Sequence, residues 1–359
     1  GSEIGTAQMA GSIAAIPASF LWGALADRLQ APARALQLAT RCALLAAVGL
    51  IFARTPLTVA LLLFLRGLAE PAIIPLIDTV AINAVHAELG ASYARVRLFG
   101  SLGFIVSAQG AGLLLARFSD PDGTRVMPLA YAATLLVTTV VAELLPADRL
   151  ERGPKPNLRE VRALGADGRL ILLLAACAVH AASLATYPLY GALVHDRGFS
   201  PAVTGAGMAF GVVAEVIVLF AFPALERRFS IATLLACTFG ATALRWWLVS
   251  RDLSAAWLVA VQGFHGLSFG LYWACAVKAL SQWVPARLRA TGQAMFSSIA
   301  SSLGGAIGYR LAGLGYERLG GAGPVYAWTA AVELLALGLA LYLRGGERRG
   351  ALVLKDETG

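Results

Sequence analysis

The chain has 359 residues, of which 58% are hydrophobic and 14% charged, and its mean hydropathy is +0.71. Soluble domains are about half apolar and about a quarter charged, so a soluble protein of this size could not bury so much apolar surface. The net charge of +8 comes from basic residues between apolar runs, and no nucleic-acid-binding motif accompanies them. We therefore predict an all-α membrane protein that contacts the lipid bilayer and has no nucleic-acid partner.

The apolar runs are long enough to cross a membrane. A bilayer core about 30 Å thick needs roughly 20 apolar residues of helix. The sequence contains about eleven such stretches, which predicts about eleven transmembrane helices. In chain order, they are Gly5–Ala26, Arg34–Ala53, Pro56–Ala84, Val96–Arg117, Met127–Pro146, Arg169–Val194, Pro201–Leu225, Ile231–Ser250, Ser254–Gln282, Leu288–Tyr316 and Pro324–Leu343.

Basic residues are concentrated in alternate loops. The richer loops and the C-terminal tail contain Arg28, Arg34, Arg95, Arg149, Arg152, Lys155, Arg159, Arg162, Arg227, Arg228, Arg287, Arg289, Arg348, Arg349 and Lys355. The other loops contain mainly Arg54, Arg125, Arg197, Arg251 and Arg318. Because basic loops stay in the cytoplasm, we expect a multi-pass protein of the bacterial inner membrane with a cytoplasmic C-terminus.

The chain divides into two similar halves. Trp22–Arg28 matches Phe222–Arg228 at an offset of 200 residues, and Arg95–Arg97 matches Arg287–Arg289 at an offset of 192. Such parallel repeats are typical of transporters. The polar segment 147–168 predicts a cytoplasmic linker between the halves. The expected domains are an N-terminal bundle of about five helices at 1–146, the linker at 147–168, a C-terminal bundle of about six helices at 169–345 and a cytoplasmic tail at 346–359.

Three motifs resemble the major facilitator superfamily. Gly23–Arg28 resembles the loop signature between its second and third helices. Tyr93–Phe104 is similar to the start of the fifth helix, and Gln262–Gly270 to the tenth helix, in the branch around lactose permease, phenylpropionate porters and nucleoside–proton symporters. The resemblance implies the major facilitator fold, with two pseudo-symmetric helical bundles. The first half shows no counterpart of the helix Arg169–Val194, so we expect that one N-terminal helix is absent.

The resemblance to lactose permease also implies the residues of a substrate site. An acid on helix four and an arginine on helix five correspond to Asp78 and Arg97. The tryptophan that stacks on the sugar corresponds to Phe104. The implied gating loop contains Gly23, Asp27 and Arg28.

In the second half, the implied contacts lie on helices eight, nine and ten. The corresponding residues are Glu215, Arg245 and His265. The helix-ten carboxylate that exchanges the proton in that family is Ser268 here, three residues after the histidine. Proton coupling would therefore fall to Glu215, His265, Asp78 or Glu70.

Ionisable residues inside the expected spans support the same selection. Each costs about 2.5–3.5 kcal/mol to insert, so it persists where it faces a cavity, forms a pair or has a function. Arg66 and Glu70 are four residues apart and could form a self-neutralising pair. Glu215 could carry a proton or bond a neighbouring helix, His180 could be structural, and Lys278 could reach the interface.

These observations favour a secondary active transporter of a sugar, nucleoside or aromatic acid, working as a proton symporter. A proton-coupled exporter and a truncated, non-transporting homologue remain alternatives. An enzyme would need a catalytic or metal-binding cluster, and the sequence shows none, so we expect no enzymatic activity, metal or cofactor. The four cysteines lie apart in apolar stretches and are expected to be free. Small solute, protons and lipid are the expected partners of a monomer.

Overall fold

The computed structural model describes residues 2–29, 31–77, 80–81, 93–118, 123–145, 158–285, 288, 292–293 and 295–357. Within these ranges the chain forms helices and the turns between them, and no strand. All eleven expected stretches are predominantly helical where they are described. By length and hydropathy alone, seven helices in this part of the chain are long and apolar enough to cross a membrane.

The first half contributes a group of long helices. They are α1 (Ser2–Leu29), α2 (Pro32–Phe52), α3 (Pro56–Ala69) with the 3₁₀ turn η1 (Glu70–Ala72), α5 (Tyr93–Arg117) and α6 (Gly123–Glu143). The start of α3 shows how the sequence sets a boundary. Thr55 Oγ1 accepts from the Thr58 amide at 3.2 Å, and Thr58 Oγ1 accepts from the Thr55 amide at 3.1 Å. Pro56 follows in the first helical position, where no amide hydrogen is needed.

The second half contributes a larger group. It contains α7 (Leu158–Gly165), α8 (Gly168–Leu184), α9 (Leu189–Asp196), α10 (Pro201–Glu226), α11 (Ile231–Val249), α12 (Ala255–Val261), α13 (Tyr272–Trp283), α15 (Gly304–Arg318) and α16 (Ala322–Glu357). Between α12 and α13 the helix continues through a 3₁₀ turn, η2 (Gln262–Phe264), and a π-helical turn, η3 (Gly266–Leu271). A second π-helical turn, η5 (Phe296–Leu303), leads into α15.

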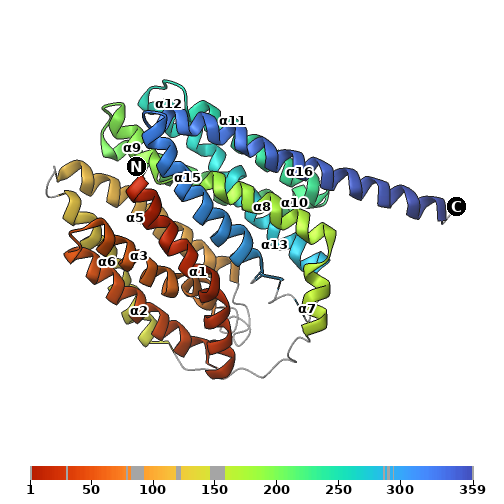
Figure 1. Cartoon of the computed structure of the whole chain (residues 1–359), viewed down its shortest axis with the longest axis horizontal. Coiled ribbons are helices and arrows are strands. Elements are labelled where there is room, and N and C mark those ends of the chain that lie inside the picture. Colours follow the sequence, from red (N-terminus) through yellow and green to blue (C-terminus); the bar gives the residue numbers. More distant parts are fainter. Residues whose placement is uncertain are drawn as a thin grey trace.

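Two helices extend beyond the ends expected for them. The expected gating loop at Gly23–Arg28 lies within α1, which continues to Leu29 because no glycine or proline follows Gly23 before Pro32, the first residue of α2. The expected C-terminal tail is also largely helical, since α16 continues to Glu357 and projects from the body of the molecule (Figure 1). Its leucines and charged residues favour helix, and two adjacent glycines at 345–346 do not end it.

The helices form two bundles that lie side by side (Figure 1). Helices α1 to α6 make one bundle and α8 to α16 the other, with α7 near the cytoplasmic end expected for the linker. The bundles contact through α1 with α15 and through α5 with α10. Glycines permit these contacts: a Cβ on Gly5 would lie 2.4 Å from the Tyr309 carbonyl oxygen, and a Cβ on Gly112 would lie 2.9 Å from Gly205 Cα.

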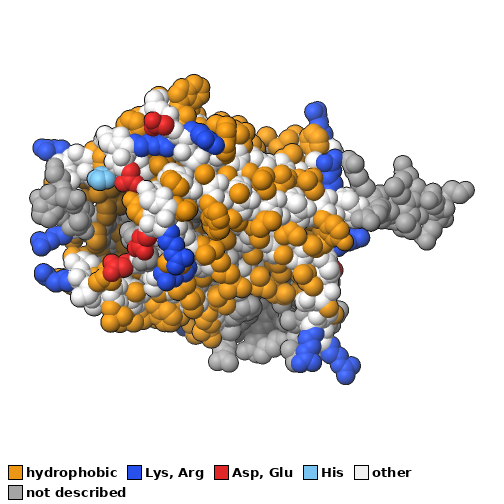
Figure 2. Space-filling view, turned by 45° about the horizontal axis from the view of Figure 1, so that its top comes forward, with side chains coloured by type: hydrophobic (Ala, Val, Ile, Leu, Met, Phe, Trp, Pro, Cys, Tyr) orange, Lys and Arg blue, Asp and Glu red, His pale blue; other side chains and the backbone are white. Residues whose placement is uncertain are grey.

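The outer surface suits lipid rather than water. Hydrophobic side chains cover the middle of the face in Figure 2, and Lys and Arg side chains gather towards its two ends. Many large apolar side chains are exposed, for example Leu45 at 74%, Leu57 at 79% and Phe220 at 79%. Such apolar exposure around helices that satisfy their own backbone hydrogen bonds identifies a multi-pass integral membrane protein.

Candidate functional site

The structure brings Glu215, His265 and Arg245 into one polar network. Glu215 lies in the middle of α10, and His265 lies between η2 and η3. Glu215 Oε2 is 3.5 Å from His265 Nε2, and each side chain is 14% exposed. Two glycines allow η3 to approach α10 this closely, because a Cβ on Gly266 would lie 2.6 Å from the Ala214 carbonyl oxygen and one on Gly270 would lie 3.0 Å from Glu215 Cγ. The acid–histidine pair therefore depends on the absence of side chains at these two positions.

Tyr187, in the turn between α8 and α9, links this pair to Arg245. Arg245 Nη2 donates to the Tyr187 hydroxyl at 2.7 Å, and that hydroxyl is 3.2 Å from His265 Nδ1. A guanidinium can only donate, so the tyrosine oxygen accepts from it. A hydroxyl has one hydrogen and two lone pairs, so the tautomer of His265 decides whether Tyr187 donates to Nδ1 or accepts from it. The polar contacts run from Arg245 through Tyr187 and His265 to Glu215.

Arg245 is fully buried in α11. Its Nη1 donates to Ser268 Oγ at 2.7 Å and its Nη2 also donates to Gln262 Oε1 at 2.5 Å, while Nε has no partner. The guanidinium carbon lies 4.9 Å and 4.6 Å from the ring centroids of Tyr187 and Trp246. The described part of the chain offers Arg245 no ion pair. A hydroxyl at Ser268 occupies the place where the resemblance implied a carboxylate.

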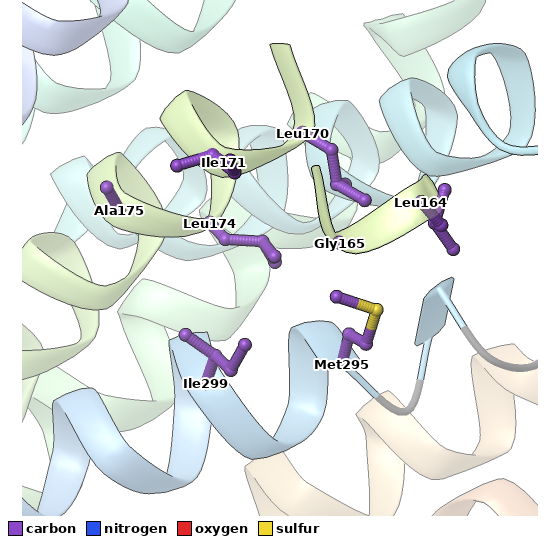
Figure 3. Close-up of a pocket in the computed structure, with 8 residues that line it drawn as sticks. All are labelled: Leu164, Gly165, Leu170, Ile171, Leu174, Ala175, Met295 and Ile299. Carbon is purple, nitrogen blue, oxygen red and sulfur yellow. The ribbon is translucent and has the colours of Figure 1, made fainter. Parts of the chain in front are cut away.

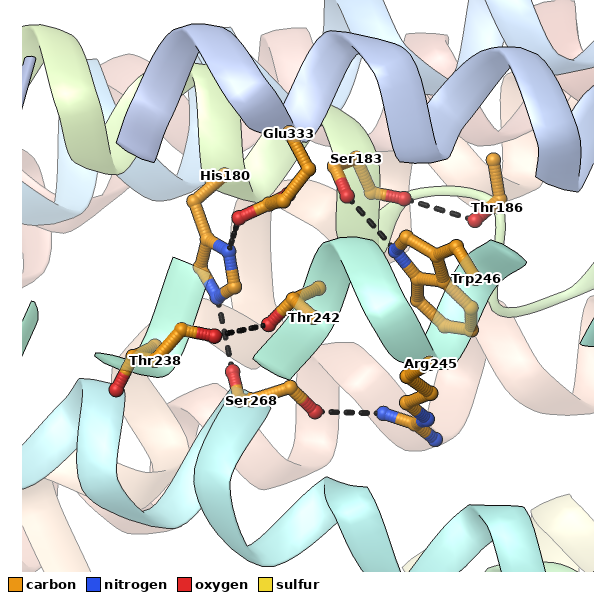
Figure 4. Close-up of polar contacts among 9 residues, drawn as sticks. All are labelled: His180, Ser183, Thr186, Thr238, Thr242, Arg245, Trp246, Ser268 and Glu333. Atoms are coloured by element: carbon orange, nitrogen blue, oxygen red, sulfur yellow. Dashed lines mark hydrogen bonds and ion pairs between the residues drawn. The ribbon is translucent and has the colours of Figure 1, made fainter. Parts of the chain in front are cut away.

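A second buried contact extends from the same serine. The Ser268 carbonyl oxygen accepts from His180 Nε2 at 2.8 Å, and His180 Nδ1 is 2.6 Å from Glu333 Oε1 (Figure 4). His180 and Glu333 are both fully buried. Ser268 lies in η3, and a π-helical turn shifts the backbone out of the regular i→i−4 pattern, which is common at functional sites. Ser268 thus connects the α11 arginine to a histidine of α8 and a glutamate of α16.

Several of these residues were missed in the sequence. Tyr187 and Gln262 are neutral, and neutral polar side chains are too frequent in membrane helices to single out. Glu333 did carry a signal, since it stands alone in the apolar span Pro324–Leu343. His180, by contrast, was left open between a structural and a functional role, and the structure gives it two polar contacts.

In the N-terminal bundle, Arg66 and Glu70 form the expected pair. Arg66 Nε lies 2.9 Å from Glu70 Oε2, and the two side chains are about 30% exposed, at 31% and 28%. The Tyr131 hydroxyl, from α6, donates to Glu70 Oε1. The pair is thus held by a third residue. In the other bundle, Lys278 of α13 forms an ion pair of 2.8 Å with Glu226 at the end of α10.

The remaining predicted site residues are Asp78, Arg97, Phe104 and the three residues of the expected gating loop. Asp78 lies outside the described residues. Arg97, Gly23, Asp27 and Arg28 lie in described helices, but their side chains fall outside the described part. Phe104 is 51% exposed and shares a helical face of α5 with Ala108 and Gly112, the face that meets α10.

A separate cavity of about 230 Å³ lies beside α7 and α8 (Figure 3). Its lining consists of Leu164, Gly165, Leu170, Ile171, Leu174, Ala175, Met295 and Ile299. These residues offer no ionisable group to orient a polar solute, so the cavity is a poor candidate site. The described residues contain no cluster of three or more metal-binding side chains, and all four cysteines are free.

Comparisons with known proteins agree with this architecture. The profile of the MFS_1 like family matches residues 1–328. The chain is 28% identical over 351 residues to "Maltose permease" of Geobacillus stearothermophilus, covering 97% of this chain and 87% of that protein. It is 26% identical over 260 residues to "Probable 3-phenylpropionic acid transporter" of Escherichia coli (strain K12), covering 69% and 65%.

A solved structure shows the same fold. The crystal structure of nucleoside transporter NupG superposes with a TM-score of 0.78 at 16% identity, covering 95% of this chain and 90% of that one. At this identity, the likeness concerns the fold alone. The family profile matches most of the chain, and this match shows which family the chain belongs to. The chain belongs to the MFS_1-like family of the major facilitator superfamily, as its motifs predicted.

Proposed function

We propose that the chain is a secondary active transporter that moves a small polar solute across the inner membrane by proton symport. The expected solutes are a sugar, a nucleoside or an aromatic acid. The observation that carries the proposal is the chain of polar contacts from Arg245 through Tyr187 and His265 to Glu215 inside apolar helices. Polar groups at this depth are costly unless they have a function, and here they meet at a partly exposed acid.

Glu215 is the proposed proton carrier, with His265 as its partner. Glu215 lies in the middle of α10, and its carboxylate offers two oxygen atoms to a proton. Its Oε2 is 3.5 Å from His265 Nε2, so the imidazole can stabilise the ionised acid. The solute would contact Glu215 and His265 from one side, with Asp78, Arg97 and Phe104 of the other bundle opposite. Arg245 would not contact the solute itself, and would act on His265 through Tyr187.

Alternating access would come from rocking of one bundle, at 1–146, against the other, at 169–345, with 147–168 as the connection. The glycine contacts Gly5–Tyr309 and Gly112–Gly205 support this, since they lie near helix ends that the topology assigns to the outer face. In that topology the C-terminus is cytoplasmic. We propose a monomer as the working unit.

The test is uptake by the purified protein in liposomes under an imposed pH gradient. Labelled maltose, uridine and 3-phenylpropionate represent the three solute classes. The parent should accumulate one of them only when the proton gradient drives it. Glu215→Gln should abolish accumulation. The matched change Glu226→Gln, on the same helix but paired with Lys278 outside the network, should leave it intact.

Two results would contradict the proposal. Accumulation by Glu215→Gln that equals the parent would remove Glu215 from coupling. Accumulation of a solute by the parent without any dependence on the proton gradient would exclude proton symport altogether.

A further inference from the structure

The immediate surroundings of Arg245 are electrically unusual. Its buried guanidinium touches only neutral acceptors, namely Ser268 Oγ, Gln262 Oε1 and the Tyr187 hydroxyl. The described residues place no carboxylate within 4.0 Å of it, and its Nε has no partner. A buried cation without a counter-charge is strongly unfavourable. Some negative charge must therefore balance Arg245 from beyond its first contacts.

Glu333 is not that charge. Both ring nitrogens of His180 face oxygen atoms, Glu333 Oε1 and the Ser268 carbonyl oxygen. The carbonyl can only accept, so Nε2 carries a hydrogen, and a second hydrogen must lie between Nδ1 and Glu333. Whether this proton is on the histidine or on the acid, the pair has no net charge. It leaves Arg245 uncompensated.

Glu215 is the remaining acid of the network. When Glu215 is ionised and His265 neutral, the charges of Glu215, His265 and Arg245 are −1, 0 and +1, and they sum to zero. When Glu215 takes a proton, the sum becomes +1. Coulomb interactions are strong at low dielectric, so this charge opposes movement of the loaded bundle through the membrane.

We infer that the site takes an anionic solute, of the monocarboxylate class, together with the proton on Glu215. The inference rests on the proposed function and names its substrate class. One anion and one proton restore the site to zero charge, as in the empty, ionised state. A proton alone leaves +1 and an anion alone leaves −1. The two neutral states are those that reorient readily, which links the flux of the anion to that of the proton.

The other charged side chains that the structure describes near Glu215 do not disturb this count. On α10 itself, Glu226 is neutralised by Lys278 at 2.8 Å. At the end of α9, His195 and Asp196 lie 3.9 Å apart, near the expected outer face. The α12–η2 segment presents the neutral Gln262, and η3 presents His265. On α5, Phe104, Ala108 and Gly112 mark the face towards α10, while Arg117 lies at the far end and the side chains of Arg95 and Arg97 are outside the described part.

The test compares two probes that differ in charge and little in shape, 3-phenylpropionate and 3-phenylpropionamide. Purified protein is reconstituted in liposomes, with the pH gradient and the membrane potential imposed separately. The parent should accumulate the carboxylate with the proton gradient, and a negative-inside potential should not change the rate. The amide should not accumulate. Apparent affinity for the carboxylate should rise as the pH falls, by up to about tenfold per pH unit, because one proton binds per anion.

Glu215→Gln supplies the second measurement, since glutamine imitates the protonated acid. This variant should exchange internal for external carboxylate, with an affinity that no longer depends on pH, and should fail to accumulate it. Arg245→Lys, which keeps the cation, should retain the preference for the carboxylate over the amide. Arg245→Gln should lose the preference for the carboxylate over the amide. If Arg245→Gln does not fold, the exchange measured with Glu215→Gln still tests the inference.

The outcomes separate this inference from the proposed function. Proton-driven uptake of maltose, uridine or the amide would keep the proposed symport and overturn the anionic substrate. Carboxylate uptake accelerated by a negative-inside potential would show that positive charge moves, and would also overturn it. If neither aliphatic nor aromatic monocarboxylates were transported or exchanged, by parent or by Glu215→Gln, the inference would be wrong.

Discussion

Each ring nitrogen of His180 faces an oxygen atom, and this sets its protonation. The distances are 2.6 Å to Glu333 Oε1 and 2.8 Å to the Ser268 carbonyl oxygen. A neutral imidazole has one donor and one acceptor, so it satisfies both contacts only if Glu333 is itself protonated. An imidazolium satisfies both directly. In either case, the buried pair holds one extra proton, counted relative to a neutral histidine beside an ionised acid.

This protonation is observable by nitrogen NMR of labelled histidine side chains, since the chain has four histidines and each can be assigned by substitution. We expect the His180 signals of the parent to show a hydrogen on Nε2 and a hydrogen bond at Nδ1. Glu333→Gln should change them to those of a neutral ring, with hydrogen on Nε2 and Nδ1 accepting from the amide. A parent spectrum in which Nε2 of His180 carries no hydrogen would refute this arrangement.

The same pair makes a prediction about stability. Glu333→Leu leaves a buried histidine without its acid, and removing one partner of a buried pair typically costs about 3–5 kcal/mol. His180→Phe with Glu333→Leu replaces both by apolar groups beside Phe239 and Tyr272, which already contact the His180 ring. We expect the double variant to regain most of the thermal stability in detergent. A double variant less stable than Glu333→Leu would argue that the charge itself holds the helices together.

At this scale, sequence reasoning selected three residues that the structure brings into one polar network, Glu215, Arg245 and His265. Their signal was clear because an ionisable side chain in an apolar span is costly and therefore informative. Tyr187 was missed because it is neutral, and only the fold places its hydroxyl between Arg245 and His265. Glu333 had the same signal as Glu215 but matched no family position. Its partner His180 is 153 residues away in sequence, a pairing that only the fold reveals.

At the scale of helices, hydropathy predicted nearly every element. Apolar runs of about 20 residues are a strong signal because the membrane has a fixed thickness. The π-helical turns η3 and η5 were not predicted, since they depend on contacts with neighbouring helices rather than on local preference. The extension of α1 through Arg28 was missed for a different reason. A family motif known as a loop was given more weight than the absence of glycine or proline between Gly23 and Pro32.

Helix packing gives a quantitative prediction for two glycines. A Cβ on Gly308 of α15 would lie 2.2 Å from the Ala182 carbonyl oxygen of α8, whereas a Cβ on Gly338 of α16 would meet nothing within 4 Å. Gly308→Ala must push two helix backbones apart, and overpacking of this kind costs about 1–3 kcal/mol. Gly338→Ala should be neutral or stabilise by up to about 1 kcal/mol through helix propensity.

Thermal unfolding of the two variants in detergent tests this directly. Both substitutions add one methyl group within a helix, so their difference isolates the contact between α8 and α15. Equal melting temperatures would mean that the two helices do not approach as closely as the structure shows.

At the scale of the whole molecule, the contacts between bundles would be one state of the proposed alternating-access cycle. Gly205 lies in the first turns of α10, and Gly112 lies near the end of α5, both at the expected outer face. A Cβ on Gly205 would lie 2.8 Å from the Ala108 carbonyl oxygen, so the two helices touch through their backbones. This end is closed between α5 and α10, and a transporter must separate the helices here to admit solute from outside.

A bulky residue at this contact should shift the balance between states. Gly205→Leu raises the free energy of the state closed at the outer end, so the population should move towards the open state by the amount of that difference. In a background without native cysteines, Ala108→Cys should react slowly with a membrane-impermeant maleimide added outside. Adding Gly205→Leu should accelerate the reaction.

Gly110→Leu is the matched control, because a Cβ on Gly110 meets nothing within 4 Å although it lies on the same helix as Gly112. It should leave the labelling of Ala108→Cys unchanged. Fast labelling in the parent would mean that this end is open in the membrane. Equal acceleration by both leucines would mean that bulk alone, rather than loss of the α5–α10 contact, alters access. Acceleration by Gly205→Leu alone would establish this contact as the outer closure, because only there does the added side chain compete with backbone packing between bundles.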